Sequence, residues 1–205
     1  MNDQINEKRS IFDIIKSNLK IIISLILLIL ISLVIYAWIE NSANKKRANL
    51  SEQYIDAKIF LSEKNESEAL KILEEIIDKK DSTYSVLSLY LIIDRDLQKN
   101  GNKILDYYNK VISINSLKKD DLDLLKFKKA VFISYRSDEK EILELLNPII
   151  NSDSVWKTQT IKFLADFYFS KKEFNKANLY YSQLLESENS NLNRKEIEQK
   201  IKNKK

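Results

Sequence analysis

Residues 54–81 read YIDAKIFLSEKNESEALKILEEIIDKKD, and this stretch decides the fold. Its apolar residues recur at 3.6-residue spacing on both sides of a short polar run, which is typical of two helices joined by a turn. Ala57 stands three residues before Phe60 in the first helix, and Ala69 stands four residues before Leu73 in the second. Two antiparallel helices pack closely where one offers a small side chain to receive the other's bulky one. The stretch therefore predicts a closely packed helix pair.

The pattern returns near the C-terminus, where residues 161–189 read IKFLADFYFSKKEFNKANLYYSQLLESEN. Ala165 and Ala177 now occupy the small positions, and Ala177 follows Ala69 by 108 residues, or three steps of 36. A helix pair cannot bury its apolar face alone, so pairs repeated at a fixed period stack into an array. The two intermediate steps fall near Leu105 and Ile142, where the alanines are absent. A helical bundle with coincidental alanines is the alternative.

The same periodicity predicts four helix pairs and a lone polar helix that covers the open end. They span 48–63 and 66–79, 83–99 and 102–115, 120–136 and 138–151, 154–170 and 173–187, and finally 191–203. Good N-cap residues stand at several of these starts, namely Ser82, Asp120, Ser137, Ser154 and Asn191. The chain has one glycine and one proline, whereas a β-rich fold needs many of both in its tight turns. The sequence thus predicts an all-α protein.

Before the array, residues 21–39 read IIISLILLILISLVIYAWI and carry no charge. As a helix this stretch spans roughly 29 Å, which matches the hydrocarbon thickness of a bilayer. Tyr36 and Trp38 stand at its end, where amphipathic rings favour the headgroup layer. No small-x-small cleavage site follows and no cysteine is available for acylation, so we expect a retained transmembrane helix and not a cleaved signal peptide. Basic residues on its two sides are nearly balanced and leave the orientation open.

The composition excludes several classes of chemistry. The 205 residues include no cysteine and no histidine, so thiolate nucleophiles, imidazole bases, haem ligands and Cys/His zinc sites are excluded. A single glycine, Gly101, cannot build a Gly-rich phosphate loop. The net charge of +4 has no basic block alternating with aromatics, which argues against a nucleic-acid partner. We expect no enzyme, with no catalytic, cofactor-binding or metal-binding residues and no small-molecule substrate.

The period and the small and aromatic positions resemble tetratricopeptide repeats. Signature positions are occupied in the first repeat by Ala57, Phe60, Ala69, Leu73 and Ile76, and in the fourth by Ala165, Tyr168, Phe174, Ala177, Tyr181 and Leu184. Repeats two and three are degenerate, with weak support from Gly101 and Tyr108. The helix-end proline of the motif is missing, since Asp81 and Asn189 stand there. The resemblance implies a right-handed array of about four helix pairs with a C-terminal capping helix.

The whole layout is similar to a bacterial family of membrane-anchored tetratricopeptide proteins described as ancillary subunits of the SecYEG translocon, whose domain is shared with a cell-division coordinator. The apolar span ending in YAWIE, the polar stalk and the degenerate repeats carry this resemblance, and Trp156 is kept where that family often has Pro-Trp. It implies a cytoplasmic or interfacial segment 1–20, an inner-membrane helix 21–39, a polar stalk 40–47 and a periplasmic repeat domain 48–205.

In tetratricopeptide arrays the first helices of the pairs line a concave groove. By that register the groove is lined by Tyr54, Lys58 and Leu61 in repeat one and by Lys162, Asp166 and Phe169 in repeat four. Mixed apolar and charged lining suits an extended peptide or a partner helix. Chaperone C-termini are not expected ligands, because the Lys-then-Asn pattern of carboxylate clamps is absent. The predicted function is a membrane-anchored protein-interaction module that assists the translocon or envelope protein assembly, with protein partners and possible secreted clients.

A second hypothesis is a structural, self-associating membrane tether without clients. Degenerate repeats could pack against a second copy, and Ser24 and Ser32 lie eight residues apart on one face of the span, where small side chains permit helix pairing. Each residue of the proposed groove could equally be part of a solvated helix face.

Overall fold

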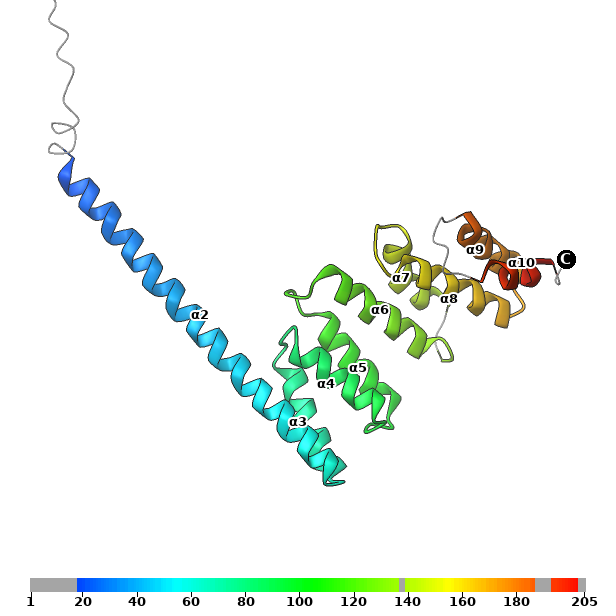
Figure 1. Ribbon diagram of the computed structural model, residues 1–205, viewed down its shortest axis with the longest axis horizontal. Helices are drawn as coiled ribbons and strands as arrows, with labels where there is room; N and C mark the ends of the chain where they lie inside the picture. Colours follow the sequence, from blue (N-terminus) through cyan, green and yellow to red (C-terminus); the bar gives the residue numbers. More distant parts are fainter. Residues whose placement is uncertain (1–17, 137–138, 187–192, 203–205) are drawn as a thin grey trace, which may run out of the picture. The chain divides into compact units, whose positions relative to one another are not determined.

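The computed structural model describes residues 18–136, 139–186 and 193–202, and all regular structure within them is helical (Figure 1). The described helices are α2 (Leu19–Ser62), α3 (Glu66–Asp78), α4 (Tyr84–Asp94), α5 (Gly101–Ile112), α6 (Lys119–Ile133), α7 (Glu139–Ile150), α8 (Lys157–Ser170), α9 (Phe174–Glu186) and α10 (Arg194–Lys202). The chain divides between Glu52 and Gln53 into two compact units.

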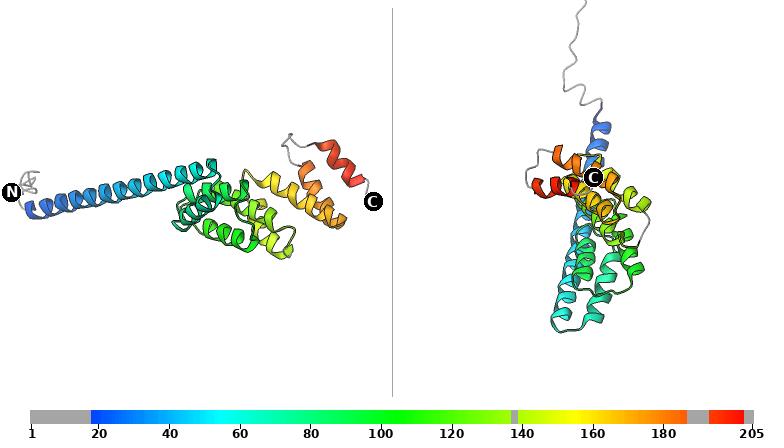
Figure 2. Two further views of the ribbon diagram at one scale, coloured as in Figure 1. Left: turned by 90° about the horizontal axis from the view of Figure 1, so that it is seen from below. Right: turned by 90° about the vertical axis from the view of Figure 1, so that its right-hand side faces the viewer.

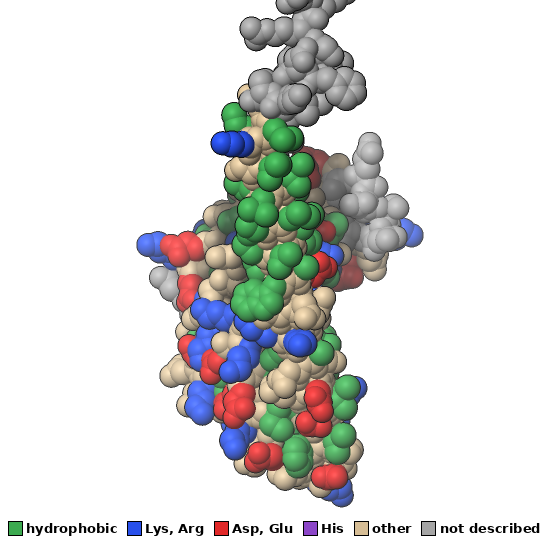
Figure 3. Space-filling view, turned by 90° about the vertical axis from the view of Figure 1, so that its left-hand side faces the viewer, with side chains coloured by type: hydrophobic (Ala, Val, Ile, Leu, Met, Phe, Trp, Pro, Cys, Tyr) green, Lys and Arg blue, Asp and Glu red, His purple; other side chains and the backbone are tan. Residues whose placement is uncertain are grey.

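The first unit contains the apolar part of α2. Every described side chain from Ile21 to Ile39 is exposed, and Figure 3 shows hydrophobic side chains covering the visible face of this part of the helix. Three exposed basic residues follow along α2, namely Lys45, Lys46 and Arg47. Among the described helices, α2 is the one with the length and composition needed to cross a membrane. The predicted stalk, residues 40–47, is helical and continues α2 without a break.

The second unit is built from helix pairs that pack around two hydrophobic clusters. The left view of Figure 2 shows the helices from α3 to α10 following one another in chain order. The first cluster contains buried residues from the end of α2 and from α3, α4, α5 and α6. The second contains buried residues from α6, α7, α8, α9 and α10. Phe132 on α6 packs against both clusters. We call α2/α3, α4/α5, α6/α7 and α8/α9 repeats one to four, and the two helices of each repeat its A and B helices.

Small side chains lie where the helices of a repeat approach. Ala57, Ala69, Ala165 and Ala177 are all fully buried, as the sequence predicts. Ala130 on α6 is also fully buried and stands twelve residues before the buried Ile142, which is the spacing of Ala57 to Ala69. Repeat three therefore keeps a small residue on its A helix, which the sequence reading missed.

The predicted register is wrong by one residue in repeat two. Ile104 is 9% exposed and belongs to the core there, whereas Leu105 is only partly buried. α4 also ends earlier than predicted, at Asp94 and not at residue 99. Asp96 adopts a left-handed conformation with φ of 52°, and the residues up to Asn100 form a loop, after which α5 begins at Gly101, one residue before the predicted start.

Helices in this chain end without glycine. Lys64, Asp96 and Lys172 have φ of 62°, 52° and 63°, in the left-handed region where glycine is usual. Each sits in a Schellman motif, in which the following amide donates to the carbonyl five residues earlier; the three pairs are Asn65 to Phe60, Leu97 to Ile92 and Glu173 to Tyr168. Two lysines and one aspartate thus stand where glycine is usual.

The helix starts differ from the predicted caps. Thr83 and not Ser82 precedes α4, and the Asp81 carboxylate accepts hydrogen bonds from the Thr83 and Tyr84 amides. Asp120 lies inside the first turn of α6, where a carboxylate is favourable near the positive end of the helix dipole. Ser154 accepts from the Trp156 amide just before α8. Ser137 and Asn191 lie outside the described residues, as do the predicted helix residues 187 and 203.

A serine hydroxyl joins repeat one to repeat two. The Ser85 hydroxyl accepts a hydrogen bond from the Asp81 amide at 3.0 Å and donates one to the Ile76 carbonyl at 2.8 Å. It therefore bridges two backbone groups at the end of α3. Ser88, one turn further along α4, is equally buried, but its hydroxyl has no hydrogen-bond partner among the described residues.

These two serines give a matched test of the fold. Ser85→Ala should lower the free energy of unfolding by about 1–3 kcal/mol, because it removes two hydrogen bonds worth about 0.5–1.5 kcal/mol each, one from the half-buried Asp81 amide and one to the Ile76 carbonyl. Ser88→Ala should leave stability unchanged or raise it by up to about 1 kcal/mol, because it removes an unpaired buried hydroxyl. Urea unfolding followed by circular dichroism measures both. Equal losses in the two variants would contradict the bridging role of Ser85.

Candidate functional site

The A-helix residues predicted to line a groove fall into two separate sets of contacts. In repeat one, Tyr54 and Leu61 are half-buried on α2 and Lys58 is exposed. In repeat four, Asp166 and Phe169 are half-buried on α8 and Lys162 is exposed. The structure does not gather all six side chains around one cavity. Their role in partner binding stays a prediction.

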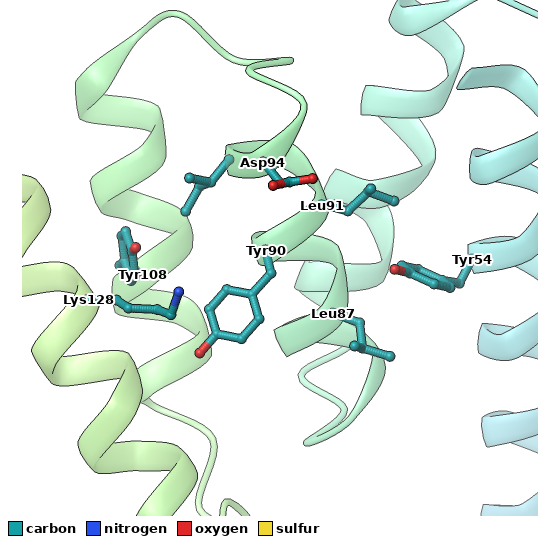
Figure 4. A pocket seen from close by; sticks show the side chains of 8 residues that line it. Tyr54, Leu87, Tyr90, Leu91, Asp94, Tyr108 and Lys128 are labelled. Carbon is teal, nitrogen blue, oxygen red and sulfur yellow. The ribbon is translucent and has the colours of Figure 1, made fainter. Parts of the chain in front are cut away.

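Tyr54 lines a pocket of about 400 Å³ that crosses the A helices of repeats one to three. Residues of four helices line it: Tyr54 on α2; Leu87, Tyr90, Leu91, Ile93 and Asp94 on α4; Tyr108 on α5; and Lys128 on α6. Figure 4 shows Leu87 and Leu91 pointing toward Tyr54, while Tyr90 points toward Lys128. Leu87 is 39% exposed, so an apolar side chain is open to a ligand at this point.

One half of the pocket is apolar and the other half carries a cation. The Lys128 ammonium lies 4.8 Å from the centre of the Tyr90 ring, a cation–π distance. Burial, together with the negative charge of Asp121, raises the pKa of Tyr90 to about 12. Burial also raises the pKa of Tyr108 above its ordinary value, with a further contribution from Tyr90. Both phenols therefore remain neutral hydrogen-bonding groups at physiological pH.

Sequence reasoning found Tyr54 but missed the rest of this pocket. Repeat two has no alanine on its A helix, and the buried positions of α4 are held by Ser85, Ser88, Leu89 and Ile92. Without the alanine, the face of α4 that carries Tyr90 could not be assigned. In the structure, the buried residues of α4 leave Tyr90 and Leu87 on the opposite side of the helix.

In repeat four, the corresponding face of the A helix α8 forms hydrogen bonds with other residues of the chain. Asp166 accepts hydrogen bonds from Lys162 at 2.7 Å, from the Tyr181 hydroxyl at 2.6 Å and from Lys200 at 3.0 Å. Burial alone would raise the pKa of this carboxyl, but the three hydrogen bonds outweigh burial and hold the pKa of Asp166 below its usual value. Asp166 is therefore an ionised acceptor that ties α8, α9 and α10 together.

The aromatic rings beside Asp166 contact the same lysine. The Lys200 ammonium lies 5.8 Å from the centre of the Phe169 ring and 5.6 Å from that of Tyr181. Ile197, one turn earlier on α10, is buried in the second hydrophobic cluster. The predicted groove residues Asp166 and Phe169 thus lie against α10 of the same chain, a contact that residue spacing within a repeat could not reveal.

Comparisons with known proteins bear on the fold. No protein-family model matches the sequence, and no curated protein matches it. Two crystal structures of nearly identical TPR-like repeats from a Podosopora anserina kinesin light chain, one of them a variant, are similar to this chain with a TM-score of 0.50 and 14% sequence identity. The similarity covers 76% of this chain and 84% and 85% of theirs. The predicted fold class is confirmed: the chain is an all-α protein with a long apolar N-terminal helix and a tetratricopeptide-like helical repeat array.

Proposed function

We propose that this chain is a membrane-anchored protein-binding module that holds a partner segment along the A-helix face of repeats one to three. The observation that carries the proposal is the pocket crossing these repeats, which joins an exposed leucine, three tyrosines and one lysine. Tyrosine rings supply large contact areas at low entropic cost and are enriched in protein-binding sites. Function in such an array comes from a surface and not from the fold.

The pocket favours a protein segment as its ligand. Leu87, Leu91 and Tyr54 offer an apolar wall, while the Lys128 ammonium and the phenols offer polar partners to a peptide backbone or side chain. An extended peptide or a partner helix combines both kinds of group along its length. Because the chain has no cysteine and no histidine, we further propose that it binds without catalysing a reaction.

The apolar part of α2 would serve as the anchor. It has the length and composition to cross a membrane, and its described side chains from Ile21 to Ile39 are exposed as lipid contact requires. A signal sequence shares this composition, but the apolar stretch is longer than a usual signal core and no small-x-small site follows it. The resemblance to translocon-associated proteins supports the finer proposal of an inner-membrane anchor, a periplasmic array and partners in the translocon or in envelope assembly.

Self-association is the alternative, and one observation favours it. Ile55 and Ile59 lie one turn apart on α2 and are 53% and 49% exposed. Exposed apolar residues on one helix face are a common contact between copies of a chain. Such a contact would make the chain a structural tether.

Site-specific photocrosslinking in intact cells separates the two proposals. A photoreactive residue at Leu87 should yield adducts with one or a few other proteins, because this side chain opens onto the pocket. Leu179 is the matched control, since it is also an exposed leucine, at 67%, but lies on the B helix α9. A third variant carries the photoreactive residue at Ile55. Adducts of twice the chain's own mass from this variant, together with no adducts to other proteins from the Leu87 variant, would favour the tether and contradict the binding module.

The orientation is tested by protease protection. We expect the array to be digested only after the outer membrane is permeabilised, since the proposed location is the periplasm. The measurement is immunodetection of the C-terminal fragment in intact cells and in permeabilised cells. Protection in both cases, with α2 shown to be inserted in the membrane, would place the array in the cytoplasm and remove the translocon-associated proposal.

A further inference from the structure

Helix α10 lies on the part of the A-helix face that repeat four would offer to a ligand. It has nine residues, Arg194–Lys202, and packs against α9. Four side chains hold it: Ile197 is 4% exposed, Ile201 is partly buried, Lys200 reaches Asp166, and Arg194 donates a hydrogen bond to the Leu185 carbonyl on α9. The remaining residues of the helix are exposed.

The surface beneath α10 recognises a cation between two rings. Asp166 supplies the carboxylate, and Phe169 and Tyr181 supply the ring faces, all within reach of the Lys200 ammonium. The helix seated there is basic, with four Lys and Arg side chains against two Glu. Its three buried or half-buried residues, Ile197, Lys200 and Ile201, lie on one face of the helix.

The Asp166 carboxylate and the Phe169 ring keep other partners when α10 is absent. Asp166 keeps its hydrogen bonds from Lys162 on its own helix and from Tyr181 on α9. The Phe169 ring keeps its contacts with Phe174 and Tyr181, whose ring centres are 5.6 Å and 6.2 Å away. No buried charge loses its last partner, so removing α10 leaves a preformed site.

α10 itself buries little apolar surface against the array. Ile197 is the single buried residue that α10 contributes to the core. An isolated helix of this length is unstable in water, because the cost of its first turn is not recovered over so few residues. Helix formation by α10 therefore depends on the surface that it covers, and a competing helix of the same chemistry could take its place.

We propose that the α8–α9 surface around Asp166 is a docking site for a basic amphipathic helix, and that α10 occupies it as an internal ligand. A partner helix carrying an apolar residue, then lysine and a second apolar residue at the spacing of Ile197, Lys200 and Ile201 binds by displacing α10. This inference rests on the proposed protein-binding function and names a second surface and a second kind of partner for it.

A labelled peptide with the sequence of residues 193–202 tests the proposal. Its binding is measured by fluorescence anisotropy on the full chain in detergent micelles, compared with the Lys200→Glu variant and with a chain that ends at residue 192. The attached α10 competes at a high effective concentration, so both variants should bind the peptide at least about tenfold more tightly than the unaltered chain. Adding Asp166→Asn to either variant should abolish most of this gain.

Lys195→Glu is the matched control, because it makes the same charge change on an exposed position of α10. It should bind the peptide as weakly as the unaltered chain. Circular dichroism confirms that each variant is folded. Equal binding by all chains, no binding by either variant, or gain that survives Asp166→Asn would overturn the proposal. Peptide binding is read directly, so it is independent of crosslinking at Leu87, and either result can fail without the other.

Discussion

Each repeat closes around a fully buried side chain on its A helix, and the rest of the array depends on this close approach. Ala57, Ala130 and Ala165 hold that place in repeats one, three and four, and the facing position on the B helix lies twelve residues later in all three. A small side chain there lets the bulky residues of the neighbouring helix pack without a void. The apolar faces left over can be buried only by the next pair, which is why the pairs stack in chain order.

The fold was predictable because this constraint leaves a local trace. Alanines at a fixed distance from aromatic or aliphatic residues, together with 3.6-residue spacing, predicted the helix pairs and their order. What failed was the register in the middle. The buried positions of the B helices, Ala69, Ile104, Ile142 and Ala177, are separated by 35, 38 and 35 residues, so the total of 108 hides one long step between two short ones. The segments between helices differ in length, and nothing in their composition fixes those lengths.

The candidate site was less predictable than the fold because it depends on which helices become neighbours. Tyr54 follows from its spacing to Ala57 within one helix. The partnership of Tyr90 with Lys128 joins α4 to α6, and that of Asp166 with Lys200 joins α8 to α10. A charged side chain on a surface helix is usually solvated, so the sequence gives no reason to choose these lysines from among the others. Only the packing of successive repeats brings them to a ring or a carboxylate.

The tyrosine pocket and the Asp166 surface belong to different halves of the array. The pocket of Tyr54, Tyr90 and Tyr108 packs against the first hydrophobic cluster, and the Asp166 surface with α10 belongs to the second. Phe132 is the side chain that contacts both. In a linear array each repeat is stabilised by its neighbours alone, so an event at one end is attenuated before it reaches the other. Exchange of α10 for a partner helix would therefore leave the tyrosine pocket intact, and the same chain could hold two protein segments at once, one on each half of its A-helix face.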